Sequence, residues 1–187
     1  MANVVEPVEL TSEDGRLLLR PPRRSEAAAA LSMLRDPDVA LWNPAPAVVD
    51  VASARDWCDR GADWAAGGHA TFSIVDATDP STYLGNVSLF ELHLDPAHAQ
   101  GSIGYRVAPA HRRKGVATAA LRTATAWAFR DVRLFRLQLF HAVDNRSSCS
   151  VAERGGYQLE GVLRSGATYG DGLRYDEHLH ARLANDS

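Results

Sequence analysis

The feature that most constrains this chain is the stretch from His111 to Thr118, which reads His-Arg-Arg-Lys-Gly-Val-Ala-Thr. It follows a strand-like segment, Ser102 to Val107, and precedes a long helical pattern that begins near Val116. The first N–H groups of a helix have no partner within the helix, and the helix dipole adds partial positive charge there. Three cations and a glycine directly before that point predict an anion site that suits a diphosphate best.

Two familiar phosphate-binding motifs do not fit this stretch. A nucleotide P-loop ends in Gly-Lys-Ser/Thr, whereas the order here is Lys114-Gly115-Val116. A dinucleotide-binding turn needs three spaced glycines after a strand, and only Gly115 is present. A solvated basic turn at the start of a helix stays open as the simpler alternative.

Composition places the chain among single-domain soluble proteins. It has 187 residues, of which 45% are hydrophobic and 23% charged, and its net charge is -3. This charge gives no global attraction to nucleic acid, so no direct nucleic-acid contact is expected. Cys58 and Cys149 lie far apart, which predicts neither a disulfide framework nor a metal site. No apolar stretch is long enough to span a membrane and no secretory signal is visible, so we expect a cytoplasmic protein.

The order of elements predicts one mixed α/β domain over residues 1–187, with residues 1–15 as a candidate flexible lead. Strands are expected at 16–20, 71–75, 83–92, 101–107, 136–143, 157–163 and 174–182. Helices are expected at 26–34 with Ser25 as its cap, from Asp50 or Ser53 to Gly67, from Val116 onward, and at 145–154. Asp36-Pro37-Asp38 is expected to break the first helix, and 41–46 to form an ordered loop. The three strands between 71 and 107 are expected to form an antiparallel meander.

The pattern Arg112-x-x-Gly115-x-Ala117 resembles the acyl-CoA pyrophosphate loop of the GNAT acetyltransferase superfamily. Further similarity lies in the strand 103–107, in 144–148 at the mouth of a short helix, in 151–161, and in Asp176 of the last strand. Together these segments are similar to the RimJ/RimL-type branch over roughly residues 16–183. The resemblance implies a mostly antiparallel sheet, flanked by helices, in which two central strands splay apart to admit the pantetheine arm of acetyl-CoA.

The resemblance also implies roles for individual residues. The splayed edge would contact the cofactor through backbone groups, the loop would hold the diphosphate, and Asn145 would contact the pantetheine arm or simply cap its helix. Ser148 would hydrogen-bond or protonate the leaving CoA thiolate; the alternative is that it is simply a capping or buried serine. The implied cofactor-binding residues are Tyr105, Arg106, Val107, Arg112, Arg113, Lys114, Gly115, Val116, Ala117, Thr118, Asn145 and Ser148.

The general base is less clear, because relatives often carry glutamate where this chain has Ser102. Glu91, His93 and His141 are the local substitutes, each able to act through water, and Glu91 is preferred. Trp42, Glu91 and His141 are the candidate substrate-binding residues, although Trp42 also fits as a core plug. Cys149 is interpreted as a small core residue rather than a nucleophile.

The leading hypothesis is direct transfer of an acetyl group from acetyl-CoA to a primary amine, without a metal. The acceptor stays open between a protein N-terminus and a small molecule. A weak base favours an α-amine, whose pKa is near 7.8, over a lysine side chain near 10.4. Two alternatives are a small-molecule or antibiotic-modifying acyltransferase that uses another acyl-CoA, and a non-catalytic CoA-binding module. Whether the chain is a monomer or a homodimer stays open.

Overall fold

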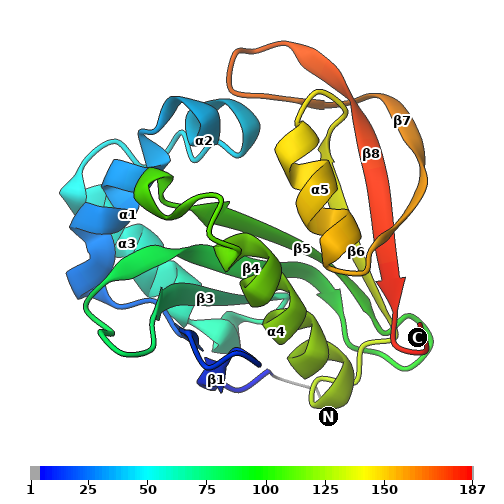
Figure 1. Cartoon of the computed structure of the whole chain (residues 1–187), viewed down its shortest axis with the longest axis horizontal. Helices are drawn as coiled ribbons and strands as arrows, with labels where there is room; N and C mark the ends of the chain where they lie inside the picture. The colour runs from blue at the N-terminus through cyan, green and yellow to red at the C-terminus, as the bar shows by residue number, and fades with distance from the viewer. Residues whose placement is uncertain (1–4, 187) are drawn as a thin grey trace.

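The computed structural model describes residues 5–186, which form a central sheet with helices packed against it (Figure 1). The eight strands follow the order β1-β2-β3-β4-β5-β6-β8-β7. Their bounds are β1 Leu10–Thr11, β2 Leu17–Arg20, β3 His69–Asp76, β4 Tyr83–His93, β5 Gln100–Val107, β6 Arg136–Ala142, β7 Gln158–Thr168 and β8 Arg174–Leu183. The α-helices are α1 Ala27–Leu34, α2 Pro37–Trp42, α3 Val51–Ala62, α4 Val116–Arg130 and α5 Arg146–Arg154.

Neighbouring strands are antiparallel except at the centre of the sheet. The expected meander is present as β3, β4 and β5. β5 and β6 pair in parallel, and α4 forms the crossover between them. The sheet is therefore mixed and mostly antiparallel, as the sequence predicted.

The helices pack in two groups around the sheet. In Figure 1, α4 lies in front of the central strands and α3 behind them. The apolar side of α4 contributes Val116, Ala120, Leu121, Ala124 and Trp127 to the main core. α1 and α3 pack on each other in a second buried cluster. Among the described residues, no helix is long and apolar enough to cross a membrane.

The boundaries around α1 and α2 differ from the prediction. Ser25 does not cap the first helix, because a short 3₁₀ turn, Arg24–Glu26, precedes it and the Glu26 carboxylate accepts the Arg23 N–H. Asp36-Pro37-Asp38 breaks the first helix as expected, since α1 ends at Leu34, but Pro37 begins a second short helix that takes in Leu41 and Trp42 of the expected loop. Asp36 caps α2 by accepting the Val39 N–H at 3.2 Å, and Pro37 occupies the first turn, where its missing N–H costs nothing.

Two further segments differ from the sequence-based expectation. The candidate flexible lead is packed from Val5 onward, since Val5 is buried in the main core and Leu10–Thr11 pair with β2; residues 1–4 lie outside the described residues. The helix expected to reach Gly67 ends at Ala62 and is followed by a separate 3₁₀ turn, Trp64–Ala66.

Candidate functional site

The start of α4 presents unpaired backbone donors, as its sequence predicted. Gly115 is the N-cap with φ 80°, a left-handed conformation that glycine adopts without strain, and no side chain caps this end of the helix among the described residues. The Ala119 N–H is the first to bond back, to the Gly115 carbonyl at 3.0 Å. The N–H groups of Val116, Ala117 and Thr118 therefore have no helical partner, and the dipole of a 15-residue helix reinforces their positive charge.

The cations around this helix start have distinct surroundings. Arg112 forms ion pairs with Asp36 and Asp38 of the α2 region, the second at 2.8 Å, so two carboxylates already engage its guanidinium. Arg113 and Lys114 are exposed. Arg16 is a cation that the sequence did not single out: its guanidinium approaches the Lys114 carbonyl at 3.5 Å.

A gap opens between β5 and β6, as expected for splayed strands. The two pair only at Gln100–Ser102 with Arg136–Gln138, and beyond that point no register continues between them. Ala108 donates to the Leu84 carbonyl on the β4 side at 2.8 Å. Because backbone groups alternate along an antiparallel strand, Tyr105 and Val107 turn theirs toward the gap, whereas those of Arg106 face β4.

Side chains occupy part of this open edge. The Tyr105 carbonyl accepts from Asn43 Nδ2 at 3.3 Å, and the Val107 carbonyl accepts from Arg112 Nε at 3.3 Å. The Arg106 guanidinium donates to the Asn43 carbonyl at 3.0 Å. The carbonyls of the edge thus have partners in side chains, while its N–H groups face the gap.

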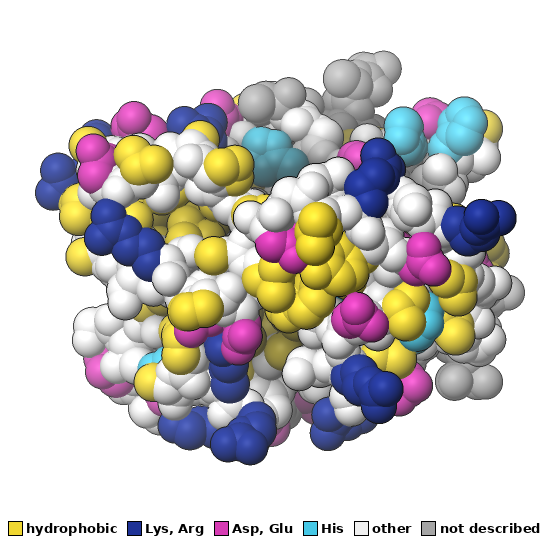
Figure 2. Space-filling model, turned by 90° about the horizontal axis from the view of Figure 1, so that it is seen from above, with side chains coloured by type: hydrophobic (Ala, Val, Ile, Leu, Met, Phe, Trp, Pro, Cys, Tyr) yellow, Lys and Arg dark blue, Asp and Glu magenta, His cyan; other side chains and the backbone are white. Residues whose placement is uncertain are grey.

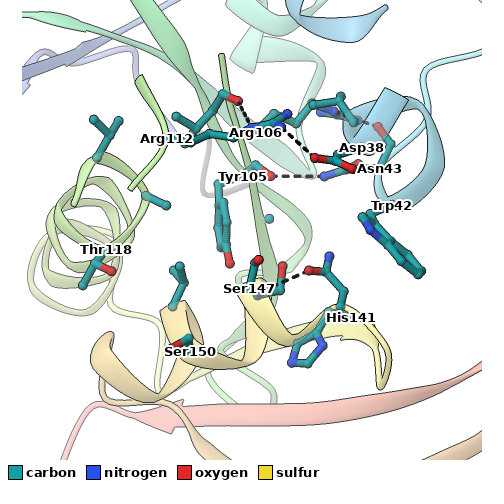
Figure 3. A pocket seen from close by; sticks show the side chains of 18 of the residues that line it. Asp38, Trp42, Asn43, Tyr105, Arg106, Arg112, Thr118, His141, Ser147 and Ser150 are labelled. Atoms are coloured by element: carbon teal, nitrogen blue, oxygen red, sulfur yellow. Dashed lines mark hydrogen bonds and ion pairs between the residues drawn. The ribbon is translucent and has the colours of Figure 1, made fainter. Parts of the chain in front are cut away.

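A cavity of about 1010 Å³ joins the gap to the start of α4 (Figure 3). Its walls come from α2, β5, the loop before α4, β6 and α5. Figure 2 looks onto the molecule from above and shows hydrophobic side chains gathered near the middle of this face, beside a hollow. Among the predicted site residues, those that line the cavity are Trp42, Tyr105, Arg106, Val107, Arg112, Arg113, Gly115, Val116, Ala117, Thr118, His141, Asn145 and Ser148.

The α5 wall brings Asn145 and Ser148 to the cavity. Asn145 caps α5, with its Oδ1 accepting the Ser148 N–H at 3.2 Å, which leaves its amide nitrogen available to a ligand. Tyr105 points at this wall from β5 (Figure 3), and its buried phenol oxygen has no standard hydrogen-bond partner among the described residues. Burial raises the pKa of Tyr105 to about 12, and the nearby Ser148 hydroxyl opposes this rise to a smaller degree. Two hydroxyls therefore face one part of the cavity.

The opposite end of the cavity carries an aromatic group. Trp42, at the end of α2, contacts Tyr169 of the β7–β8 turn and Tyr175 of β8 in edge-to-face geometry, with ring centroids 5.7 and 5.5 Å apart. The Gly170 N–H donates to the Leu41 carbonyl at 2.9 Å, which ties the turn to α2. Trp42 is half-buried, so it both packs against the turn and offers a surface to the cavity.

The candidate bases lie in different places. Glu91 is exposed at a bulge of β4, with φ 52°, and accepts a hydrogen bond from the Ser102 hydroxyl at 3.0 Å. Neither Glu91 nor His93 is among the cavity-lining residues. His141 lines the cavity and is 4% exposed, and burial lowers its pKa, which favours a neutral ring. The Asp144 carboxylate also lines the cavity, although no pattern in the sequence marks it as a site residue.

An uncapped helix start and a parted pair of strands meet at one cavity, and this geometry suits an extended ligand with an anionic end. Comparison with known proteins gives the family. The model of the acetyltransferase (GNAT) domain matches residues 16–158, which is more than half of the chain. The chain therefore belongs to the GNAT acetyltransferase domain family, and the predicted membership is confirmed.

Individual relatives agree with the predicted branch. The chain is 37% identical over 99 residues to "Putative ribosomal N-acetyltransferase YdaF" of Bacillus subtilis (strain 168), covering 52% of this chain and about half, 54%, of that relative. The structure of Mycobacterium smegmatis RimJ in complex with CoA-disulfide superimposes with a TM-score of 0.80 and 26% identity, over 95% of this chain and 87% of that chain. The structure of RimL, a ribosomal L7/L12 α-N-protein acetyltransferase in complex with coenzyme A, shares the fold at 20% identity, with a TM-score of 0.79 over 95% and 98% of the two chains.

Proposed function

We propose that this protein transfers the acetyl group of acetyl-CoA directly to a primary amine, with the α-amino group of a polypeptide as the preferred acceptor. The observation that carries the proposal is that the uncapped start of α4 and the gap between β5 and β6 lie on one cavity. The first suits a diphosphate and the second suits an amide-bearing chain, and the pantetheine arm of CoA joins these two parts.

The residues present fit acetyl-CoA. The N–H groups of Val116, Ala117 and Thr118 would hold the diphosphate, with Arg113, which lines the cavity, and Arg16, which pairs with Asp14 and reaches the Lys114 carbonyl, as additional cations. The N–H groups of Tyr105 and Val107 would pair with the pantetheine amides as a neighbouring strand does. Arg112, held by two aspartates, would act mainly by fixing the shape of the loop.

Transfer requires a neutral amine, a polarised thioester and a stabilised leaving group. The amine nitrogen attacks the thioester carbonyl carbon, the C–S bond breaks, and the amine loses one proton as the amide forms. Backbone N–H groups of the open β5 edge would polarise the carbonyl oxygen. The Ser148 hydroxyl would donate a hydrogen bond or proton to the departing sulfur, and a thiol with a pKa near 8.5 needs no stronger acid.

Glu91 is the proposed base, acting through water. Ser102 holds its carboxylate beside the point where β5 and β6 separate, which is where relatives often place a glutamate. Since Glu91 lies outside the cavity lining, a water molecule must relay the proton from the amine. Such a relay suits an α-amine, because its pKa lies about 2.6 units below that of lysine.

The acceptor would approach the aromatic group formed by Trp42, Tyr169 and Tyr175. Trp42, held by the two tyrosines, would offer apolar surface in the cavity for a first side chain, and the Asp144 carboxylate would offer charge for an ammonium group before that group is deprotonated. The names of the ribosomal-protein acetyltransferases among the relatives support a protein N-terminus as the acceptor class.

The test is release of free CoA thiol from acetyl-CoA, with product identification by mass spectrometry. Acceptors are short peptides with free N-termini, the same peptides with a blocked N-terminus and one free lysine, and a panel of small amines. The proposal expects acetylation of free N-termini above the blocked controls. Turnover on small amines alone would show that the acceptor is a small molecule and not a polypeptide. Faster turnover with a longer acyl-CoA would show that acetyl-CoA is not the preferred donor. Tight CoA binding without turnover on any acceptor would favour the non-catalytic module.

A further inference from the structure

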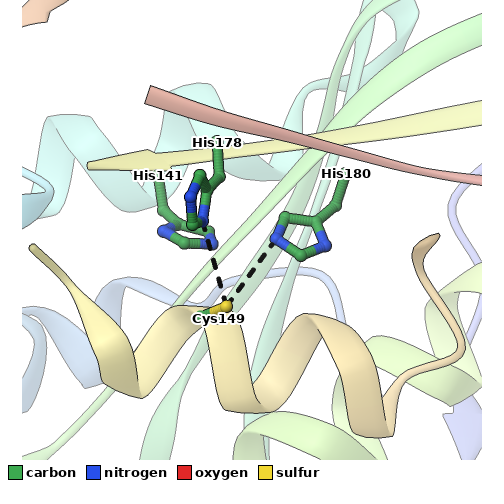
Figure 4. A group of neighbouring side chains, drawn as sticks. All are labelled: His141, Cys149, His178 and His180. Atoms are coloured by element: carbon green, nitrogen blue, oxygen red, sulfur yellow. Dashed lines mark hydrogen bonds between the residues drawn. The ribbon is translucent and has the colours of Figure 1, made fainter. Parts of the chain in front are cut away.

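Four potential metal ligands meet behind the cavity, on the side of α5 that packs against the sheet. His141 comes from β6, Cys149 from α5, and His178 and His180 from β8 (Figure 4). One ligand atom from each of these side chains lies within 4.8 Å of the others. The Cys149 sulfur is 3.9 Å from His178 Nδ1 and 4.0 Å from His180 Nε2.

Two of the histidines have their ring protons assigned by neighbouring carbonyls. His141 Nδ1 lies 2.8 Å from the Ala142 carbonyl and must donate to it, because a carbonyl only accepts. His180 Nδ1 lies 3.3 Å from the Tyr157 carbonyl and has the same constraint. In the neutral rings, both Nε2 atoms then carry lone pairs. A carbonyl acceptor on the far nitrogen is also the usual support for a metal-bound histidine.

The cluster is not satisfied by its own hydrogen bonds. His141 is 4% exposed and its Nε2 has no partner among the described residues. His180 is 1% exposed. Within the cluster, the possible donors to these lone pairs are the Cys149 thiol and the single ring proton of His178, and the Glu153 carboxylate, 3.7 Å from the sulfur, also accepts from that thiol. Buried acceptors without donors are costly, and a cation at their centre would satisfy all of them at once.

The distances suit a small divalent ion after a modest contraction. Zinc binds imidazole nitrogen at about 2.0 Å and thiolate sulfur at about 2.3 Å in tetrahedral geometry, which places neighbouring ligand atoms about 3.3 to 3.6 Å apart. The two sulfur–nitrogen distances exceed this by about half an ångström. A movement of α5 toward β8 would close that difference, and the wider separations in the group, up to 4.8 Å, would close through rotation of the histidine side chains.

We propose that His141 Nε2, Cys149 Sγ, His178 Nδ1 and His180 Nε2 form a four-coordinate site for Zn²⁺ or a divalent metal of similar preference. Four protein ligands leave no open position, so the site is structural rather than catalytic. On binding, the Cys149 S–H bond breaks, the thiolate bonds the metal, and the proton passes to solvent; no oxidation state changes. The metal would clamp α5, which carries Asn145 and Ser148, onto β6 and β8.

This inference does not depend on the proposed acetyl transfer, and its test needs no activity assay. The untagged full-length chain is freed of metal with a chelator, incubated with Zn²⁺, separated from unbound ion and analysed by elemental mass spectrometry. We expect one zinc per chain and a higher unfolding temperature with Zn²⁺ than without. Co²⁺ in place of Zn²⁺ should give the visible bands of tetrahedral cobalt and a thiolate-to-cobalt absorption in the near ultraviolet.

Variants locate the metal. Cys149→Ser should abolish the thiolate absorption and weaken binding, and His178→Ala should remove the thermal shift caused by Zn²⁺. Cys58→Ala changes the other cysteine, which lies in the second buried cluster, and should retain full metal content. The proposal is overturned if the wild-type chain retains no zinc, if Cys149→Ser and His178→Ala retain as much as wild type, or if bound Co²⁺ gives the weak spectrum of an octahedral ion on the surface.

Discussion

Arg112 and Asp36 form an ion pair that ties the loop before α4 to the start of α2. The same guanidinium also bonds Asp38 at 2.8 Å and the Val107 carbonyl at 3.3 Å. By resemblance, the sequence assigned Arg112 to the diphosphate. The structure shows that Arg112 joins two walls of the cavity, so its contacts hold the loop before α4 against the α2 wall.

Asp36→Asn should isolate the contribution of this ion pair. Asparagine still caps α2, but it removes the charge, so we expect a loss of about 1.5 to 3 kcal/mol in the free energy of unfolding at pH 7. Burial acts to raise the pKa of Asp36, but the hydrogen bonds from Arg112 and Val39 outweigh it and the pKa is lowered. A carboxyl group whose pKa is lowered by folding stabilises the folded state at a pH above its unfolded-state pKa. This stabilisation is lost as the pH falls through the folded-state pKa.

Urea unfolding of wild type and Asp36→Asn across pH therefore checks the sign. The difference in the free energy of unfolding between wild type and Asp36→Asn should be constant above about pH 5 and should become smaller below about pH 4. A difference that widens on acidification would contradict the assigned role of the pair.

Gly115→Glu should weaken CoA binding far more than Gly115→Gln. Both side chains meet the same left-handed backbone strain at φ 80°, and Arg16 Nη2, 3.8 Å from an added Cβ, is the nearest atom to either. Only glutamate adds a negative charge, which at about 5 Å from a phosphate and an effective dielectric near 20 costs about 3 kcal/mol, or roughly a hundredfold in affinity. Calorimetric titration with CoA measures the difference, and equal affinities for the two variants would place the diphosphate elsewhere.

Ser148→Ala should lower kcat by about 10- to 100-fold with little change in the KM for acetyl-CoA, because the hydroxyl acts on the leaving sulfur. Ser148→Thr keeps a hydroxyl and should recover part of the rate. Tyr105→Phe is the companion change, since the phenol oxygen has no hydrogen bond to lose. It should leave the free energy of unfolding within about 1 kcal/mol of wild type. An unchanged kcat in Ser148→Ala together with a large loss in Tyr105→Phe would transfer the role to the tyrosine.

Glu91→Gln should lower kcat by about 10- to 100-fold near pH 7 and by less at higher pH, where more of the amine is neutral without a base. The neighbouring Ser102 offers a rescue. The double variant Glu91→Gln/Ser102→Glu moves the carboxylate from β4 to the neighbouring position on β5 and should regain part of the rate. A Glu91→Gln enzyme with a wild-type pH profile would remove Glu91 from the mechanism.

Local signals in the sequence predicted the parts of the fold that local chemistry determines. Gly115 before an apolar helical face located the start of α4, and Asn145 with Gly156 located both ends of α5, where Gly156 has φ 82°. Asp36-Pro37-Asp38 correctly marked the end of α1, but the short helix that begins at Pro37 was not expected, because proline ends a helix in one context and begins one in another. The Asp36 cap decides between them.

Long-range contacts could not be predicted in the same way. The partners of Arg112 lie more than 70 positions earlier in the chain. His141 and His180 come from separate strands, β6 and β8, that pair only in the folded sheet, and Cys149 joins them from α5. Cysteine spacing therefore predicted no metal site, whereas the fold brings four ligands together. The hydrogen bond between Ser102 and Glu91 likewise depends on the β4–β5 register, which the sequence pattern does not specify.

The most direct test of this account is a crystal structure of the chain with acetyl-CoA bound. We expect diphosphate oxygens within about 3.2 Å of the N–H groups of Val116 to Thr118, and pantetheine amides paired with Tyr105 and Val107 in the gap between β5 and β6. A diphosphate bound away from the start of α4, or β5 and β6 joined along their full length with the cofactor outside them, would contradict it.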